Sequence, residues 1–432
     1  MKKQLLCTSA IALGVAVASP VAAQEWNVGL GGYYVLHMGF GDYGGSSGVL
    51  NPNAAAVGAG ALQGDFDGFQ MFQDAEVHVI PQITLDNGMT FGANIQFETA
   101  DGSDMDEVYI QVSSDTFGTL QLGYENSVGA QSMVAAPNVT LMPINSGSTS
   151  GFTPLTGSGF GSGSGGGFAF LDASRSAYTE VWGGYGNSDV ARINYFTPSF
   201  NGFTLGLSYA ADNVGSDGAF GNPNNNTPGV LSDIWDIGVN YSQTFGTTDV
   251  AIGARYGQGS AASGSFLTAA VATGGPGSLI GAGTGIVTGA FVPVTSDPST
   301  WAIGGSVTFN GVTVGGHYAE NDNGGEAGLL DTSGWGFGVA YDMPGPWSVS
   351  FTTFQSEVDG TGTITTGPAA GTTFSGNHDL ETYIIGASRN LGPGVDWGLW
   401  IFYEDYSSDA GSPLAGNDID STVVGTSISL SF

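Results

Sequence analysis

The feature that most constrains the fold of this chain is a short segment with apolar side chains at every second position, which recurs along the sequence. One copy reads FTLGLSYA at 203–210, and another reads WGFGVAYD at 335–342. Successive side chains of a β-strand point to opposite faces, so this period of two predicts strands with one apolar face. From residue 24 onward the sequence shows no convincing 3.6-residue apolar period, and glycine, β-branched and aromatic residues are frequent throughout. We therefore predict an all-β chain.

The connections between these segments alternate between very short and long. Seven are short, and several contain the Asn-Gly or Gly-Pro pairs of tight hairpins. They lie at 86–88, 115–118, 198–202, 246–249, 310–311, 343–346 and 392–394. Long stretches rich in Gly, Ser, Asn and Asp separate them, including 126–188 and 259–299. Short periplasmic turns and long extracellular loops are typical of outer-membrane barrels, whereas a soluble β-sandwich has no reason to alternate them.

Seven short turns and eight long loops join 16 strands, so the sequence predicts a 16-stranded antiparallel transmembrane β-barrel with both chain ends on the periplasmic side. The predicted strands are 25–39, 71–85, 89–99, 105–114, 118–126, 189–197, 202–211, 232–245, 249–258, 300–309, 312–320, 332–342, 346–357, 379–391, 395–406 and 419–432. Many aromatic residues lie near these boundaries, which favours two girdles at the lipid headgroup level, although each ring alone is compatible with an ordinary core. They are Trp26, Tyr33, Phe117, Tyr195, Phe196, Trp301, Phe309, Trp335, Trp347 and Trp397.

The two ends of the chain indicate export and membrane assembly. A basic start and an apolar stretch are followed by small residues, so we interpret 1–23 as a signal peptide and 24–432 as the mature barrel. The last predicted strand carries alternate apolar residues up to the terminus, namely Ile428, Leu430 and Phe432. This arrangement resembles the recognition signal of outer-membrane assembly, and we expect these three residues to serve as that signal.

Composition and charge exclude several function classes. The predicted mature chain has no cysteine and carries four arginines against 38 acidic residues, a net charge of −34. Disulfide frameworks and cysteine chemistry are therefore excluded. Nucleic acid is not expected as a partner, because its recognition needs a basic surface. The 25 Phe, 16 Tyr and 8 Trp oppose the disorder that such a charge would otherwise indicate.

Four segments carry a resemblance to a known family. They are ITLDNGMTFGANIQFET at 83–99, DEVYIQVSSDTFGTLQLGYE at 106–125, ARINYFTPSFNGFTLGLSYA at 191–210 and the terminal SLSF. In this order they resemble the general (non-specific) porins of Gram-negative outer membranes. The resemblance implies a homotrimer of 16-stranded barrels in which the third extracellular loop, here 126–188, folds inward as a constriction. The glycine- and serine-rich middle of that loop, 157–167, departs from the family and leaves the path of the loop open.

Ionisable residues on the polar phase of the predicted strands are candidates for lining the pore. The alternation points Arg192 and Arg255 into the lumen, since a lipid-facing arginine costs roughly 2–4 kcal/mol at the membrane midplane. The other candidates are Asp74, Glu76, Glu98 and Glu107 on the strands, and Asp172, Arg175 and Glu180 on the third loop. The resemblance implies a basic wall facing carboxylates on that loop, and for its three residues a solvated loop with no role at the constriction stays open.

We expect a water-filled channel for the passive diffusion of ions and small hydrophilic solutes. It should prefer cations, because most ionisable residues on the inward phase are acids. A substrate-specific outer-membrane channel is the alternative. An outer-membrane enzyme is the third hypothesis, and it needs a nucleophile and a base held together. The four histidines, His37, His78, His317 and His378, are spread over distant strands and none lies in a nucleophile motif, so we expect no enzyme.

The expected partners are a second and third copy of the chain, outer-membrane lipid and lipopolysaccharide, the outer-membrane assembly machinery and small hydrophilic solutes. Many acidic residues lie in or beside the extracellular loops, and lipopolysaccharide is itself anionic. Divalent cations such as Ca²⁺ are a natural bridge between them, although a simply solvated acidic surface is the other interpretation. No other cofactor is expected.

Overall fold

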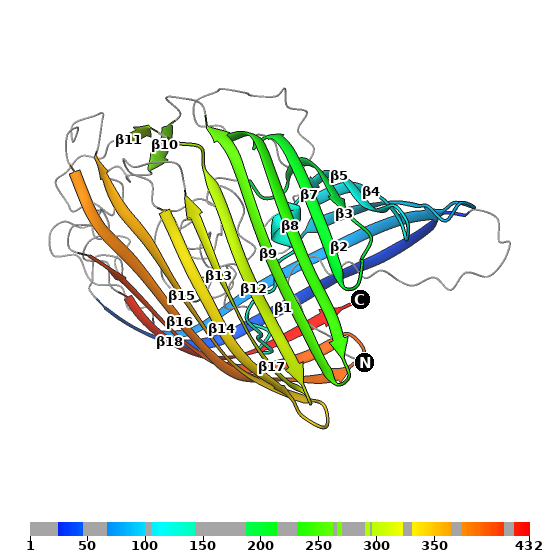
Figure 1. Cartoon of the computed structure of the whole chain (residues 1–432). Coiled ribbons are helices and arrows are strands. Elements are labelled where there is room, and N and C mark those ends of the chain that lie inside the picture. The colour runs from blue at the N-terminus through cyan, green and yellow to red at the C-terminus, as the bar shows by residue number, and fades with distance from the viewer. Residues whose placement is uncertain are drawn as a thin grey trace.

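The protein, described here by a computed structural model, forms a closed barrel of 16 antiparallel strands (Figure 1). The structure describes residues 25–45, 67–99, 105–142, 152, 187–213, 231–261, 266–269, 290–293, 296–322, 331–363, 373–409 and 419–432. The barrel strands are β1 (Asn27–Gly45), β2 (Gly68–Thr84), β3 (Thr90–Glu98), β4 (Met105–Ser114), β5 (Gly118–Glu125), β6 (Val190–Phe196), β7 (Phe203–Asp212), β8 (Leu231–Phe245), β9 (Thr248–Ala261), β12 (Ser299–Phe309), β13 (Val312–Asp322), β14 (Asp331–Asp342), β15 (Trp347–Thr363), β16 (Thr373–Gly392), β17 (Val395–Ser408) and β18 (Ile419–Ser431). The predicted fold class is confirmed.

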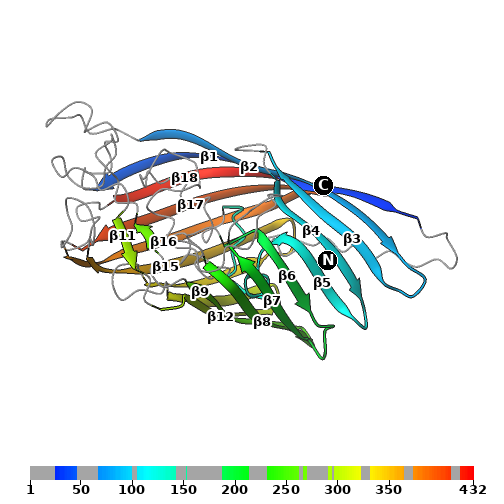
Figure 2. The same ribbon diagram turned by 90° about the horizontal axis from the view of Figure 1, so that it is seen from above.

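The barrel closes because the first and last strands pair with each other. β1 and β18 run antiparallel, with Leu36 opposite Ile428, and they lie side by side in Figure 2. Every other barrel strand pairs with its neighbours along the chain, except that β9 pairs directly with β12. Full closure leaves the wall without an edge strand, as a lipid environment requires. Within the described residues, no helix is long and apolar enough to cross a membrane.

The long stretch 259–299 contains two short strands that the sequence pattern does not predict. Two four-residue strands, β10 (Phe266–Ala269) and β11 (Ala290–Pro293), pair into a separate two-stranded sheet. Strands this short carry too few residues to display a period of two, so only their pairing reveals them.

The short turns have the backbone geometry expected of tight hairpins. Asn310 and Gly311 adopt φ values of 49° and 82°, and Asn201 and Gly202 adopt 50° and 88°. Two consecutive residues with positive φ match the right-handed twist of the flanking strands, and Asn followed by Gly is the pair that tolerates them. These turns therefore fix the register of the strands on either side.

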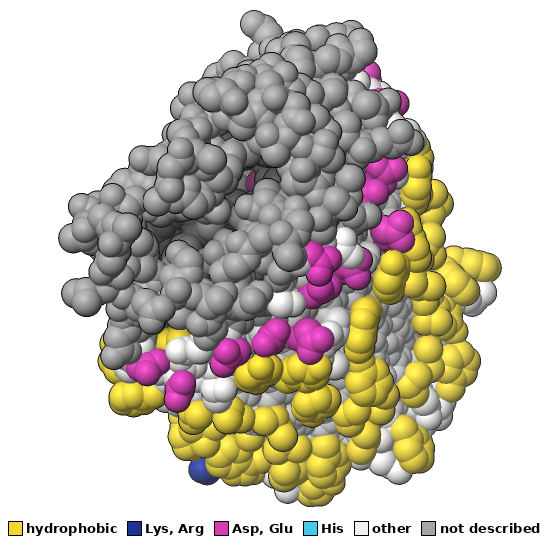
Figure 3. Space-filling model, turned by 90° about the vertical axis from the view of Figure 1, so that its left-hand side faces the viewer, with side chains coloured by type: hydrophobic (Ala, Val, Ile, Leu, Met, Phe, Trp, Pro, Cys, Tyr) yellow, Lys and Arg dark blue, Asp and Glu magenta, His cyan; other side chains and the backbone are white. Residues whose placement is uncertain are grey.

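The period of two sorts side chains between lipid and lumen. On β7 the side chains of Phe203, Leu205 and Leu207 are exposed on the outside, whereas Gly206 and Ser208 are buried on the inside. Figure 3 shows the outward side chains as a continuous apolar band, with a row of Asp and Glu along one edge. An apolar exterior band and a polar interior are the arrangement of a barrel that spans a membrane.

The third long connection enters the barrel, as predicted. After β5, Ser127 caps the one-turn helix α2 (Val128–Gln131), which contacts β6, β7, β8 and β9. The chain from 132 to 142 then continues along the inner wall, and Phe152 packs against the wall further round. The glycine-rich segment 157–167 lies outside the described residues.

Candidate functional site

One side of the barrel interior is lined by carboxylates on β2 to β5. Phe69, Met71 and Val77 of β2 point outward, so the residues of opposite phase point into the lumen. These inward acids, which we call the acidic wall, are Asp74, Glu76, Glu98, Glu107 and Glu125. Four of them are the strand acids predicted to line the pore, and Glu125 joins them at the end of β5.

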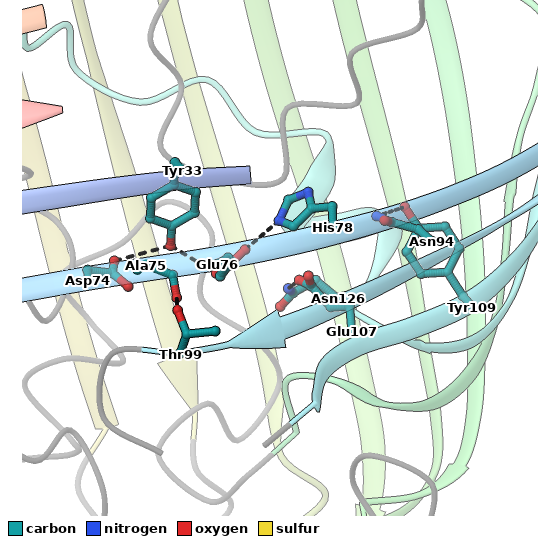
Figure 4. A network of polar contacts seen from close by, with 10 residues as sticks. All are labelled: Tyr33, Asp74, Ala75, Glu76, His78, Asn94, Thr99, Glu107, Tyr109 and Asn126. Atoms are coloured by element: carbon teal, nitrogen blue, oxygen red, sulfur yellow. Dashed lines mark hydrogen bonds and ion pairs between the residues drawn. The ribbon is translucent and has the colours of Figure 1, made fainter. Parts of the chain in front are cut away.

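Tyrosine and histidine side chains order the upper part of the acidic wall (Figure 4). The hydroxyl of Tyr33 on β1 lies 3.2 Å from Asp74 Oδ2 and 2.9 Å from Glu76 Oε1, and it can donate to either. His78 Nε2 lies 2.8 Å from Glu76 Oε2. The strand register places Glu98 directly opposite Glu76. Five polar groups from three strands thus share one patch of the wall.

The lower part of the acidic wall holds the beginning of the third loop. The Asn126 side-chain amide donates to Glu107 Oε1 and to Asp189 Oδ1, both at 3.1 Å. The backbone N–H of Asn126 donates to Glu125 Oε1 at 2.9 Å. Because Asn126 follows β5 directly and Asp189 precedes β6, these bonds join the two ends of the loop at the wall.

The two inward arginines lie behind the loop rather than in open water. Arg255 on β9 forms an ion pair with Asp236 on β8, and the two side chains are only 0% and 1% exposed. Gly129 of α2 lies directly over this pair. Arg192 on β6 is also buried, and its Nη2 donates to the carbonyl of Asn187 at 2.5 Å. Both arginines have the predicted inward direction, but their guanidinium groups are shielded.

After α2 the loop is hydrogen-bonded to strands on the far side of the barrel. We call residues 127–142 the strap. Its bonds to the wall are Asn240 Nδ2 to Ser132 O at 3.0 Å, Ala136 N to His317 Nδ1 at 3.1 Å, Thr352 Oγ1 to Pro137 O at 2.6 Å, and Val139 N to Ser350 Oγ at 3.0 Å. These side chains come from β8, β13 and β15, so the strap follows the wall through a large part of its circumference.

A second part of the inner wall is apolar. We call it the apolar wall, and it consists of Phe354 on β15, Ile384 on β16, Trp400 and Phe402 on β17, and Val423 on β18, all almost fully buried. Met142 and Phe152 of the third loop pack onto it, with ring centroids of Phe152 and Trp400 5.4 Å apart. The Tyr43 hydroxyl donates to the carbonyl of Phe152 at 2.5 Å.

The apolar wall was not predicted from the sequence, because each strand was expected to have a single apolar phase. The signal was present in β17, where the run LWIFY at 399–403 is apolar on both phases. Leu399, Ile401 and Tyr403 face outward, whereas Trp400 and Phe402 face the interior. An uninterrupted apolar run indicates a strand buried on both faces, which in a barrel requires something to cover the inside.

The described histidines do not form a catalytic arrangement. His37 Nδ1 lies 2.6 Å from Ser427 Oγ, but both residues are fully buried and the same hydroxyl accepts from the Trp400 indole at 2.7 Å. A nucleophile has to reach its substrate, so this serine and histidine serve packing. His78 contacts Glu76 and His317 holds the strap, each on a different strand.

Three of the predicted site residues cannot be placed at the acidic wall or at the strap. The loop candidates Asp172, Arg175 and Glu180 fall outside the described residues, and their role stays a prediction. In the part of the chain that the structure describes, no group of three or more His, Cys, Asp or Glu residues is arranged to hold a metal ion. The assignment of Tyr33 to an aromatic girdle is wrong, because its hydroxyl contacts Asp74 and Glu76 on the inner wall. Asn126 and Asp236 were not predicted from the sequence, because their roles depend on contacts with neighbouring strands.

The C-terminal strand closes the barrel with its apolar residues outward. Ile428, Leu430 and Phe432 are exposed on the lipid-facing side, and the backbone N–H of Phe432 donates to the carbonyl of Gly32 at 3.2 Å. The terminal residue is thus joined to β1 at the seam of the barrel. The role of these three residues as an assembly signal remains a prediction.

A closed barrel with an apolar exterior band, charged inward side chains and an inward-folded loop defines a channel protein of the outer membrane. Comparison with known families agrees with this assignment. The model of the Gram-negative porin family matches residues 8–410. The chain therefore belongs to the Gram-negative porins, and it crosses the outer membrane many times through its strands.

Solved structures share this fold at low sequence identity. The trimer form of OmpT, an outer membrane protein of Vibrio cholerae, has a TM-score of 0.52 at 11% identity, covering 94% of this chain and 99% of that one. The anion-selective porin from Comamonas acidovorans has a TM-score of 0.51 at 14% identity, covering 94% and 100%. No curated protein matches the chain. At such identities the structures support the barrel fold alone. The ion preference has to be inferred from the residues of this chain.

Proposed function

We propose that this porin forms a water-filled channel for passive diffusion of ions and small hydrophilic solutes, and that it prefers cations. One observation carries the preference: Asp74, Glu76 and Glu98 of the acidic wall are partly exposed on the inner wall, while both inward arginines are buried behind the loop. Arg255 is neutralised by Asp236, and Arg192 is held against a backbone carbonyl. Carboxylates therefore dominate the charge that a passing ion meets.

The electrostatic reason is the shape of the site. A narrow passage between low-dielectric walls focuses the field of the charges that line it. Exposed charges act only within a Debye length, about 8–10 Å at physiological salt, so acids on distant loops contribute little. The partly exposed acids of β2 and β3, Asp74, Glu76 and Glu98, lie on the lumen wall itself and act at short range.

The test is the reversal potential of the purified protein in a planar bilayer across a tenfold potassium chloride gradient. The wild type should give a cation-selective potential. The double variant Asp74→Asn, Glu76→Gln should move it toward zero, because two carboxylates facing the lumen are lost while the side-chain volumes are kept.

Glu320→Gln supplies the matched control. Glu320 lies on the outward phase of β13, where the Tyr318 hydroxyl donates to it at 3.2 Å. Removing this charge should leave the reversal potential unchanged. An anion-selective wild type, or equal shifts in the control and the double variant, would contradict the proposal.

A substrate-specific channel is the second candidate for the same site. The ordered carboxylates, Tyr33 and His78 offer hydrogen-bonding groups to a cationic solute as well as to ions. The measurement is whether one organic cation reduces the potassium current in a saturable way. If it did, and related cations had no effect at the same concentrations, this result would favour a substrate-specific channel over general diffusion.

The assembly and surroundings of the channel are further parts of the proposal. We infer a homotrimer, which is the form named for one similar structure, and contacts of the outward apolar band with lipid and lipopolysaccharide. Residues 1–23 are proposed to be a signal peptide, and Ile428, Leu430 and Phe432 to be read by the assembly machinery. Phe432→Asp should lower the amount of folded barrel in the outer membrane, whereas a normal amount would contradict this role.

A further inference from the structure

The inner wall carries an inward glycine on six of the strands that the strap crosses. These glycines, which we call the glycine belt, are Gly206 on β7, Gly238 on β8, Gly253 on β9, Gly304 on β12, Gly338 on β14 and Gly398 on β17. All six lie on the inward phase of their strands. The belt is scattered over nearly 200 positions of the sequence, and only barrel closure brings its members into one track.

Five of the six belt glycines lie against the backbone of the strap, and Gly206 lies against the Val128 side chain. A Cβ atom at Gly253 would be 2.5 Å from the carbonyl oxygen of Ser132, and one at Gly398 would be 2.6 Å from that of Thr140. At Gly304 and Gly338 the nearest atoms are the carbonyl oxygens of Val134 and Pro137, and they lie closer still. Real Cβ atoms essentially never come within 3.0 Å of such neighbours, so any larger residue would require the strap to move.

Hydrogen bonds hold the strap on this track from either side of the glycines. Asn240, two residues from Gly238, bonds to Ser132, and His317 opposite Gly304 in the strand register bonds to Ala136. Thr352 on β15, opposite Gly338, bonds to Pro137. At Gly238, Gly304 and Gly338 the missing side chain therefore leaves room for the strap, and a neighbouring side chain forms a hydrogen bond with it.

Both ends of the loop's described path are also fixed. α2 lies on the buried Arg255–Asp236 pair, with Gly129 in contact with both side chains. Further round, Phe152 is enclosed by the apolar wall. The strap is therefore confined to one surface of the lumen between two anchors.

We propose that the glycine belt consists of positioning residues that set the cross-section of the pore. The absence of side chains allows the backbone of the strap to lie flat on the wall, which leaves the passage open along the acidic wall. The inference rests on the proposed channel function and is independent of the proposed preference for cations.

The experiment compares single-channel conductance of Gly304→Ala and Gly338→Ala with that of the wild type, in symmetric potassium chloride. Each methyl group should push the strap off the wall by about an ångström toward the lumen, lowering conductance by roughly a quarter or more. The rate at which sugars enter liposomes containing the variants should fall further for large sugars than for small ones.

Two glycines provide matched controls. Gly31 on β1 also faces inward, but a Cβ there meets only ordinary contacts at 3.6 and 3.9 Å and no atom of the strap. Gly305 is the direct neighbour of Gly304 and faces outward, where a Cβ would lie 3.1 Å from the carbonyl oxygen of Ala251 and meet no atom of the strap. Gly31→Ala and Gly305→Ala should both conduct like the wild type.

Folding of each variant is checked by its heat-modifiable mobility in detergent gels. If Gly304→Ala does not fold, Gly253→Ala and Gly398→Ala can replace it, because a methyl group at either position should displace the strap by a smaller distance. Folded belt variants with wild-type conductance, or equal losses in Gly31→Ala, would overturn the proposal. A wild type that conducts but is anion-selective would refute the cation preference alone, and a wild type without conductance would refute the channel function.

Discussion

The acidic wall and the apolar wall are built from the same kind of strand and face the same lumen, yet they differ in what covers them. On β2 the inward residues Asp74, Glu76 and His78 form a polar surface. On β17 the inward Trp400 and Phe402 are covered by Met142 and Phe152 of the third loop. The period of two decides only which side chains face inward, and their chemistry decides whether water or protein covers them.

The difference has a simple energetic origin. Fully burying one large apolar side chain contributes about 1.5–3 kcal/mol, so several aromatic rings together favour docking of the loop on β15 to β18. Carboxylates would lose their hydration under the same loop, at a cost that a paired cation or hydrogen bonds must offset. Arg255 and Asp236 are such a pair, and they lie under the loop. Asp74, Glu76 and Glu98 stay partly exposed on the acidic wall.

Among the substitutions that test this comparison of the two walls, Asp236→Asn should have the largest effect. Removing the carboxylate leaves the buried Arg255 without its partner beneath α2, which should lower the free energy of unfolding by about 3–5 kcal/mol. Thermal unfolding in detergent measures the loss.

The double variant Asp236→Leu, Arg255→Met should recover most of that stability, because replacing a buried ion pair by apolar groups of similar volume is often neutral. A single variant as stable as the wild type would show that the start of the loop is not held by this pair.

Phe152→Leu should weaken the attachment of the loop to the apolar wall. The edge-to-face contacts of Phe152 with Trp400 and Phe402 are lost, at a cost of about 1–2 kcal/mol. Larger fluctuations of the single-channel current and faster proteolysis between 127 and 152 should follow. Phe97→Leu, on the outward face of β3, is the control that should change neither property.

Tyr33→Phe tests the order of the acidic wall. The substitution removes the hydroxyl that donates to Asp74 or Glu76 and leaves the charge unchanged. We therefore expect the free energy of unfolding to fall by about 1 kcal/mol and the sign of the ion selectivity to stay the same. The neighbouring Tyr34 bonds to the outward Gln73 at 2.9 Å, and Tyr34→Phe should cost less because this pair is exposed. Equal losses of stability in the two variants would show that the hydrogen bond on the acidic wall contributes no more than the exposed one.

The smallest effect is that of salt on the wild type. Between 0.1 and 1 M the Debye length falls from about 10 to about 3 Å, so the preference for cations should decrease without changing sign. Reversal potentials at several mean concentrations measure this trend. A preference independent of salt would indicate that pore geometry, rather than the acidic wall, selects the ion.

The sequence by itself determined the barrel. The predicted strand 105–114 agrees with β4 (Met105–Ser114), and the predicted turn at Asn310-Gly311 has the expected positive φ values. Both features are local, because a period of two and a two-residue turn are specified by adjacent residues. The even number of strands, the outward apolar band and the inward direction of Arg192 and Arg255 follow from the same short-range pattern.

Only the tertiary structure decided what the interior does. Arg255 could be placed in the lumen from its phase, but its burial depends on Asp236 from another strand and on Gly129 from the loop. In the same way, the glycines at 253, 304, 338 and 398 become one track only when strands far apart in the chain close into a ring. Such contacts depend on strand pairing and on the path of the loop, so the local pattern fixed the wall, whereas tertiary packing fixed which part of it the described segment of the loop covers.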